Sequence, residues 1–363
     1  MFRNFVACIW LSVVLLLLSF FFPLAAAGDQ VQLSLDSSEA HQVLAILALH
    51  SQRKPVADSE WQKLFATVPY QRLKVREKAI GEQFHDPTRA FTDDDFKRFV
   101  LSDDLLPRAA ALSSTLDRWE KADLRQDAER VLAYLPADAT IHAKVYPMIK
   151  PGINSFVWDL SSDPTIFLYL DPEVSREKFE NTVTHELHHI GLGSVGPIYD
   201  KKIADVPEPA HTAADWMGAF GEGFAMLAAA GAPDVDPHAA SSPKEHARWE
   251  HDMGEFNDNL RALNQFFLDI VNAKFASHDA MEEKGGSFYG IQGPWYTVGY
   301  KMSVMVEKRF GRPALIGTML DPRCLLVLYN RAAADQNAAG KPAIPLWSDE
   351  VFSAVHAGSC GSP

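Results

Sequence analysis

The sequence predicts an α+β fold that is mostly helical, with a small mixed sheet packed against one motif-bearing helix. Apolar residues recur at spacings of three and four along most of the chain, which is the period of an amphipathic helix. Residues 139–170 instead contain short runs of β-branched and aromatic residues separated by Gly, Pro, Asn and Asp, which is typical of strands. Helical spacing then resumes in a segment that contains His-Glu-Leu-His-His at residues 185–189.

The first 27 residues (1–27) are interpreted as a signal peptide and are left out of the fold. Arg3 gives a basic start, a long apolar run follows, and small side chains at the end are typical of a signal peptidase site. We expect cleavage after Ala27, which would make the protein extracytoplasmic, either periplasmic or secreted. The alternative is an uncleaved membrane anchor, because residues 5–27 are long enough to cross a bilayer.

The composition restricts the partners of the mature chain. The formal net charge of −13 becomes −14 when Arg3 leaves with the signal peptide. Such an acidic chain is not expected to bind nucleic acid or an anionic membrane surface. No second apolar run approaches spanning length, so we expect no stable membrane association after cleavage. Cys324 and Cys360 remain in the mature chain, and the sequence leaves open whether they pair. It does not predict the oligomeric state.

Residues 28–136 are predicted to form an N-terminal helical region. From Ser37 to about Leu135 apolar positions follow helical spacing, and prolines mark the boundaries between helices. No catalytic constellation is visible in this region, and its histidines are scattered. We therefore expect the active site in the second predicted domain, residues 137–363.

Three strands and one helix are predicted at the start of the second domain. The strands cover residues 139–146, 155–160 and 165–170. Ser175 can cap a helix that ends at Gly191. The strand that directly precedes this helix is expected at the edge of the sheet. There it could bind an extended peptide by strand addition.

The remainder of the chain is predicted to be helical. One helix covers Thr212–Ala230, a long helix runs from Pro243 to Phe275, and another covers Trp295–Phe310. The glycines at 285–290 indicate a mobile loop between the last two. Two or three short helices and a loosely ordered tail are expected to finish the chain.

The pattern His-Glu-x-x-His is the strongest chemical signal in the sequence. A four-residue step on an α-helix turns by about 400°, so His185 and His189 lie on one face. Two stacked imidazoles can hold one Zn²⁺, and Glu186 beside the first can reach a water bound to the metal. A catalytic zinc site needs three protein ligands and one open position, so a third ligand is required.

Glu222 is the preferred third ligand, because it lies on the next predicted helix. Flanking glycines would let that helix approach the first closely, and a carboxylate would complete a His₂Glu site. His211 and Asp215, in the same segment, and Glu208 in the preceding loop remain alternatives. His188 points about 100° away from His189, so it is expected beside the ligands or at the surface.

The predicted chemistry is hydrolysis of a carbonyl compound. Zn²⁺ lowers the pKa of its bound water, and Glu186 accepts a proton as that water attacks a polarised carbonyl. The developing oxyanion needs a further hydrogen-bond donor. Tyr296 or Tyr300, one helical step apart, could supply it, although both could be packing aromatics; we assign Tyr296 to the site.

Two other hydrolase patterns fail. The metzincin pattern requires Gly and His where this chain has Leu192 and Val195. A serine nucleophile elbow, Gly-x-Ser-x-Gly, would also need Gly at the position of Leu192.

With these residues in hand, the chain resembles a bacterial family described as zinc-dependent peptidases of the gluzincin type. The resemblance rests on several stretches: 134–136 (Tyr-Leu-Pro), 185–189, 221–225 (Gly-Glu-Gly-Phe-Ala), 293–302 and 307–330. It implies a zincin-like metallopeptidase domain, with His185, His189 and Glu222 as zinc ligands and Glu186 as the catalytic residue.

The function expected is therefore that of an exported zinc metallopeptidase acting on a peptide or protein substrate. One alternative is a non-peptidase zinc hydrolase on the same scaffold. The other is a catalytically silent, metal-stabilised binding protein. An intact Glu186 argues against silence, since a purely structural site has no use for that carboxylate.

Overall fold

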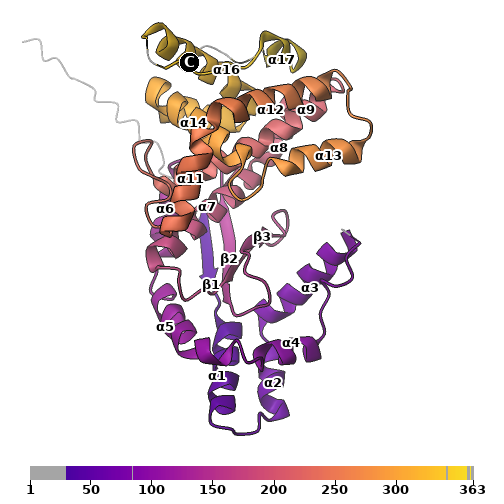
Figure 1. The fold of residues 1–363 in the computed structure, drawn as a ribbon, viewed down its shortest axis with the longest axis vertical. Coiled ribbons are helices and arrows are strands. Elements are labelled where there is room, and N and C mark those ends of the chain that lie inside the picture. The colour runs from indigo at the N-terminus through magenta and orange to yellow at the C-terminus, as the bar shows by residue number, and fades with distance from the viewer. Residues whose placement is uncertain (1–29, 84, 341, 358–359, 361–363) are drawn as a thin grey trace, which may run out of the picture.

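The computed structural model describes residues 30–83, 85–340, 342–357 and 360, and its fold is α+β and mostly helical, as predicted. Helices α1 to α5 lie toward one end of the long axis, and helices such as α9, α12, α14, α16 and α17 lie toward the other (Figure 1). A small sheet and helix α7 (Arg176–Ser194) lie between these two ends. The predicted signal peptide, residues 1–27, lies outside the described residues.

The helices that precede the second strand are mostly short. Their bounds are Ser38–Ser51 (α1), Asp58–Phe65 (α2), Val68–Gln83 (α3), Asp93–Val100 (α4), Leu106–Arg108 (η1, a 3₁₀ turn), Ala109–Trp119 (α5) and Leu124–Leu132 (α6).

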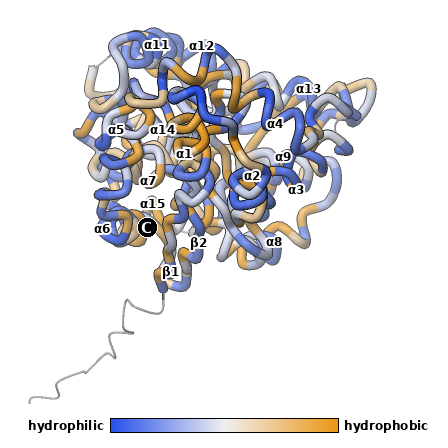
Figure 2. Tube along the Cα trace, turned by 90° about the horizontal axis from the view of Figure 1, so that it is seen from below, coloured by the Kyte–Doolittle hydropathy of each residue, from blue (hydrophilic) through white to orange (hydrophobic). Residues whose placement is uncertain are grey.

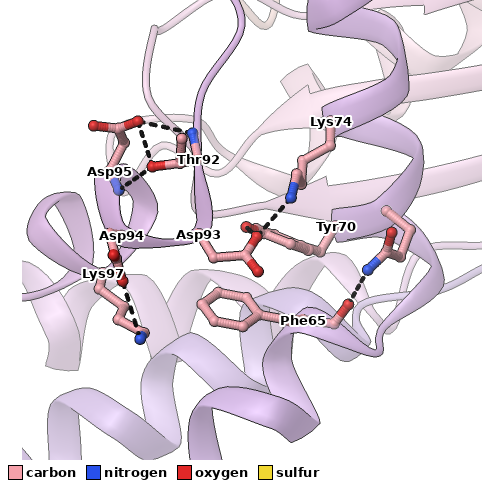
Figure 3. Close-up of polar contacts among 9 residues, drawn as sticks. Phe65, Tyr70, Lys74, Thr92, Asp93, Asp94, Asp95 and Lys97 are labelled. Atoms are coloured by element: carbon pink, nitrogen blue, oxygen red, sulfur yellow. Dashed lines mark hydrogen bonds and ion pairs between the residues drawn. The ribbon is translucent and has the colours of Figure 1, made fainter.

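Local side-chain chemistry fixes the junction of α3 with α4. Thr92 and Asp95 form a capping box at the start of α4, which satisfies backbone N–H groups that a helix end leaves unpaired. Figure 3 shows Lys74 and Tyr70 of α3 directed toward Asp93. The Lys74 amine and the Tyr70 hydroxyl donate to the Asp93 carboxylate over 2.6 and 2.7 Å. These bonds join two helices of the N-terminal region.

The sheet is small and mixed, as predicted, but it has four strands in the described part of the chain and not the three expected. The strands are β1 (Val31–Leu35), β2 (Ile141–Met148), β3 (Phe156–Trp158) and β4 (Thr165–Tyr169), in the order β1-β2-β4-β3. β1, β2 and β4 are parallel, and β3 is antiparallel to β4.

Two expectations about the sheet were wrong. The strand before the motif-bearing helix, β4, is not at the edge, because β3 folds back and pairs along its free side. The edge strand on this side is therefore β3. In addition, β1 was not identified from the sequence, since it is only five residues long and pairs with β2 more than 100 residues away.

Helix α7 begins as predicted but ends later. The Ser175 hydroxyl accepts a hydrogen bond from the Lys178 backbone N–H over 3.1 Å, which caps the helix. The helix then continues through Gly191 to Ser194, so the expected stop at Gly191 was wrong. A Cβ at Gly191 would lie 2.2 Å from Leu135 Cδ1. This glycine instead allows α7 to pack closely on the segment that leads into β2.

The C-terminal helices are more divided than the sequence predicts. Their bounds are Gly196–Ile203 (α8), Ala210–Met217 (α9), Gly218–Phe220 (η2, a 3₁₀ turn), Gly221–Ala230 (α10), Pro243–Gly254 (α11), Phe256–Val271 (α12), His278–Ser287 (α13), Pro294–Phe310 (α14), Arg312–Met319 (α15), Pro322–Ala338 (α16) and Asp349–Ala354 (α17).

Three predicted segments differ from these bounds. The helix expected over 212–230 is interrupted by η2, and the long helix expected over 243–275 is divided at Glu255 into α11 and α12. The loop expected over 285–290 is helical up to Ser287. A Cβ at Gly285 would lie 2.3 Å from the Trp216 ring, so this glycine lets α13 pack on an aromatic side chain of α9.

Two large hydrophobic cores contain most of the buried residues of the described chain, and a small third cluster lies between α8 and α9. The first joins the N-terminal helices, the sheet and the apolar face of α7, through residues such as Phe179 and Leu187. The second joins the helices from α9 onward, through residues such as Phe224 of α10 and Trp295 of α14. Figure 2 shows apolar segments gathered toward the interior and hydrophilic segments along outer helices such as α6 and α11. Helices α7 and α10 meet where the two cores adjoin.

Two further features are a disulfide bond and the length and polarity of the helices. Cys324 and Cys360 form a disulfide, which settles the question that the sequence left open. Among the helices of the described residues, none is both long and apolar enough to cross a membrane.

Candidate metal centre

The site forms where α7 faces α10. His185 and His189 lie one helical turn apart on α7, and Glu222 lies in the first turn of α10. The Nε2 atoms of His185 and His189 lie 3.1 and 3.0 Å from Glu222 Oε2. The two Nε2 atoms lie 3.0 Å from each other. Three lone-pair-bearing atoms from two helices therefore converge on one point.

The electrostatics of this cluster favour opposite charges on His189 and Glu222. Burial disfavours a charged His189, but the nearby carboxylates of Glu222 and Glu186 outweigh it and raise the pKa of His189 to about 9. Burial also disfavours a charged Glu222, yet His189 and His185 hold the pKa of that carboxyl well below its usual range. The carboxylate is therefore ionised at neutral pH, as a metal ligand must be.

The three residues fit a zinc ion. Zinc prefers imidazole nitrogen and carboxylate oxygen at about 2.0–2.2 Å in tetrahedral geometry, which places its ligand atoms about 3.3 Å apart. The three separations of 3.0–3.1 Å are close to that value. With three protein ligands, one position stays open, which is the arrangement of catalytic rather than structural zinc sites.

A cavity of about 550 Å³ opens onto this cluster. Its lining includes the three candidate ligands, Glu186 and Tyr296. The Tyr296 ring stacks on the His185 ring with centroids 6.1 Å apart. Burial, with the charges of Glu222 and Glu186, raises the pKa of Tyr296, so its hydroxyl keeps its proton and can donate it in a hydrogen bond.

A family model described as "Putative zinc dependent peptidase (DUF5700)" matches residues 61–338. The chain belongs to this family. The match includes β2, β3, β4, α7, α10 and α14, so every residue that lines the metal cluster lies within it. No curated protein and no solved structure matches the chain.

The alternative ligands of this DUF5700 member lie elsewhere. His211, Asp215 and Glu208 form a separate group at the start of α9, with His211 Nδ1 3.3 Å from Asp215 and 3.6 Å from Glu208. None of the three lines the cavity at the metal cluster. The structure therefore brings Glu222, and not these residues, to His185 and His189.

Tyr300 and His188 are also placed outside the cluster. The Tyr300 hydroxyl donates to the Val235 carbonyl over 3.2 Å, and its ring packs on Trp249. His188 is fully buried rather than at the surface, and burial followed by the neighbouring histidines lowers its pKa to about 3. It is therefore a neutral core residue beside the ligands, and it does not line the cavity at the metal cluster.

The glycines beside Glu222 act on two different neighbours. The sequence suggested that both glycines let α10 approach α7. A Cβ at Gly223 would instead lie 2.1 Å from the backbone of Gly299, so Gly223 lets α10 approach α14. Gly221 is the one that faces α7, where a Cβ would lie 3.6 Å from Leu192. Because α14 also carries Tyr296, the Gly223 contact sets the position of Glu222 relative to this tyrosine.

Sequence reasoning missed a second group of polar residues beside His185. Lys178, Asn181, His238 and Gln292 line a smaller adjoining cavity. The helical spacing of Lys178 and Asn181 from His185 could have identified two of them, since all three share one face of α7. His238 and Gln292 come from distant loops and carry no such signal.

Proposed function

We propose that this DUF5700 member is an exported zinc-dependent metallopeptidase with a zincin-like arrangement of sheet and active-site helix. The convergence of His185, His189 and Glu222 at the floor of a cavity that also exposes Glu186 and Tyr296 carries the proposal. The family description is consistent with it. The apolar run and small residues of 1–27 support export.

Each residue has a distinct role in the proposed reaction. His185, His189 and Glu222 would hold the metal. A bound zinc ion would supply Lewis acidity toward the scissile carbonyl and the attacking water. Glu186 would accept the proton of that water and pass it to the leaving amine. The Tyr296 hydroxyl would donate a hydrogen bond to the oxyanion that develops on the carbonyl oxygen.

The substrate would enter along β3. This strand lies at the edge of the sheet, and Phe156 and Val157 of β3 line the cavity beside the metal cluster. An extended peptide could pair with the free backbone groups of such a strand while its side chains occupy the cavity. The cavity lining there is largely apolar, with Leu192, Phe224 and Met319 among its side chains, so an apolar substrate residue would fit.

The decisive experiment combines metal analysis with cleavage of a peptide library. Wild-type protein is expected to hold one zinc per chain and to cleave peptides. Glu186→Gln should keep zinc but lose cleavage by at least about 10²-fold, because the proton acceptor is removed. His185→Ala should lose zinc. Glu177→Gln, an exposed glutamate in the first turn of the same helix, is the matched control and should behave as wild type.

Two outcomes would contradict the proposal. If the protein holds zinc, cleaves nothing, and Glu186→Gln changes no activity, the enzyme hypothesis fails. If His185→Ala still holds one zinc per chain, the ligand assignment is wrong.

A further inference from the structure

A cavity of about 140 Å³ adjoins the metal cluster on the side of the N-terminus of α7. Its lining includes His185 and Tyr296, which it shares with the larger cavity. Lys178, Asn181 and Thr182 also line it. These residues lie seven, four and three positions before His185, so all four side chains share one face of the helix. The two cavities are therefore neighbouring compartments on either side of the metal cluster.

Lys178 is the one permanently charged residue among the described residues that line this cavity. Its amine donates to the Ser241 hydroxyl over 2.9 Å. It makes no ion pair within the described chain. Glu245 acts on it only at longer range, because that carboxylate instead accepts from the Ser242 backbone at the start of α11. Burial lowers the pKa of Lys178, which is the sign of a cation that lacks full compensation.

Neutral groups around Lys178 are arranged as hydrogen-bond partners. His238 Nδ1 lies 2.9 Å from Ser241 Oγ, and His238 Nε2 lies 3.0 Å from Gln292 Nε2. Burial, followed by the charge of Lys178, lowers the pKa of His238 to about 4, so this ring is neutral at pH 7. The chain Lys178–Ser241–His238–Gln292 thus holds one positive charge. Two carboxylates act on it from outside the cavity lining, Glu245 on Lys178 and His238 and Asp236 on His238, but neither forms an ion pair with Lys178 among the described residues.

Gln292 has two unusual features in this cavity. Its backbone φ is 72°, a left-handed conformation that non-glycine residues seldom adopt. Its Oε1 atom is buried without a hydrogen-bond partner among the described residues. Unpaired buried polar atoms and strained backbone are costly and concentrate where a ligand binds. An amide oxygen accepts hydrogen bonds, so Oε1 would pair with an N–H group of a bound ligand and not with its carboxylate. Both features lie directly before α14, which carries Tyr296.

We propose that this cavity binds a carboxylate of the substrate, with Lys178 as the cation that recognises it. The inference rests on the proposed peptidase function and assigns its substrate class. Lys178 and His185 are seven residues apart, or about 10 Å along the helix axis. An extended peptide advances about 3.3–3.6 Å per residue, so two residues span about 7 Å, and the carboxylate-bearing group together with the lysine side chain can cover the remainder. The carboxylate could belong to an acidic side chain or to the free C-terminus.

The test compares pairs of peptides that differ only in this carboxylate. One pair has Glu or Gln next to the bond that the enzyme cleaves in the library experiment. The other pair ends two residues after that bond with a free acid or an amide. The ratio of kcat/KM for acid over amide is measured for wild type, Lys178→Met and Lys178→Arg. Lys244→Met, which removes an exposed lysine of the neighbouring helix α11, is the matched control.

Wild type and Lys244→Met are expected to prefer the acid by at least about tenfold in one of the two pairs, since a charge-assisted hydrogen bond is lost with the amide. Lys178→Met should bring this ratio close to one, and Lys178→Arg should retain most of it. Whichever pair shows the preference identifies the source of the carboxylate. The proposal is overturned if wild type shows no preference in either pair, or if Lys178→Met leaves the ratio unchanged.

A binding measurement separates this proposal from the peptidase proposal. Calorimetry with zinc-loaded Glu186→Gln, alone and combined with Lys178→Met, gives the ratio of Kd for the same peptide pairs without turnover. A Kd ratio that depends on Lys178 supports the carboxylate pocket even if wild type cleaves no peptide. Equal Kd values for acid and amide in both proteins overturn it, even if the protein is a peptidase.

Discussion

Replacing Gly223 by alanine should separate the two helices that carry Glu222 and Tyr296. A Cβ at this position would lie 2.1 Å from both Gly299 C and Tyr300 N, whereas ordinary van der Waals contact begins at 3.4 Å. Helices α10 and α14 must therefore move apart by at least about 1.3 Å. Backbone atoms cannot rotate away, so the cost should reach the upper end of the usual range for overpacking, about 3 kcal/mol of unfolding free energy.

The same movement should weaken zinc binding. Metal–ligand distances tolerate deviations of only about 0.2 Å, and Glu222 directly precedes the substituted position. We expect zinc affinity to fall by about tenfold to hundredfold, measured by competition with a chelator. Gly221→Ala is the matched control, because its Cβ would meet Leu192 at an ordinary 3.6 Å. Equal unfolding free energies and zinc affinities for the two variants would refute the reasoning.

Three further predictions concern the site and the core. Tyr296→Phe should lower kcat by about tenfold to hundredfold with little change in KM, whereas Tyr300→Phe should not, and equal effects would refute the assignment. Burial raises the pKa of Glu39 to about 8, so its carboxyl stays protonated when folded but ionises above about pH 4.5 when unfolded. The free energy of unfolding should therefore fall between about pH 4.5 and 8, by at most roughly 4–5 kcal/mol. Denaturant unfolding at several pH values measures this decrease. Glu39→Gln should make the free energy of unfolding less dependent on pH in this range, and the same pH dependence in wild type and variant would contradict the prediction. Cys324→Ser removes the bond to Cys360, which closes a separation of 36 residues, and should cost about 2–4 kcal/mol in the same assay; unchanged stability would contradict this expectation.

Local chemistry made part of the fold predictable. The Ser175 cap, the start of α11 at Pro243 and the helical face shared by His185 and His189 all depend on residues a few positions apart. Such interactions are visible in the sequence because the helix itself brings the partners together. For the same reason the mostly helical α+β class was correct.

Features that depend on distant contacts could not be predicted in the same way. Strand β1 is defined by its pairing with β2, from Val31 to Ile141, and no local pattern reports that pairing. Gly191 resembles a helix stop in sequence, but its role is set by Leu135. Glu222 could be preferred over His211 only by weighing helix contexts, because 33 residues separate it from His189. Tertiary structure decides such cases.

The metal centre lies between the two large hydrophobic cores, and its ligands come from both sides. The apolar face of α7 belongs to the first core, and α10 belongs to the second. A metal held by His185, His189 and Glu222 would therefore cross-link the two halves of the molecule, in addition to its role in catalysis. Its binding free energy would add to the cohesion between the halves, by thermodynamic linkage. Any motion that opened the cleft along this boundary would pull one ligand away from the other two.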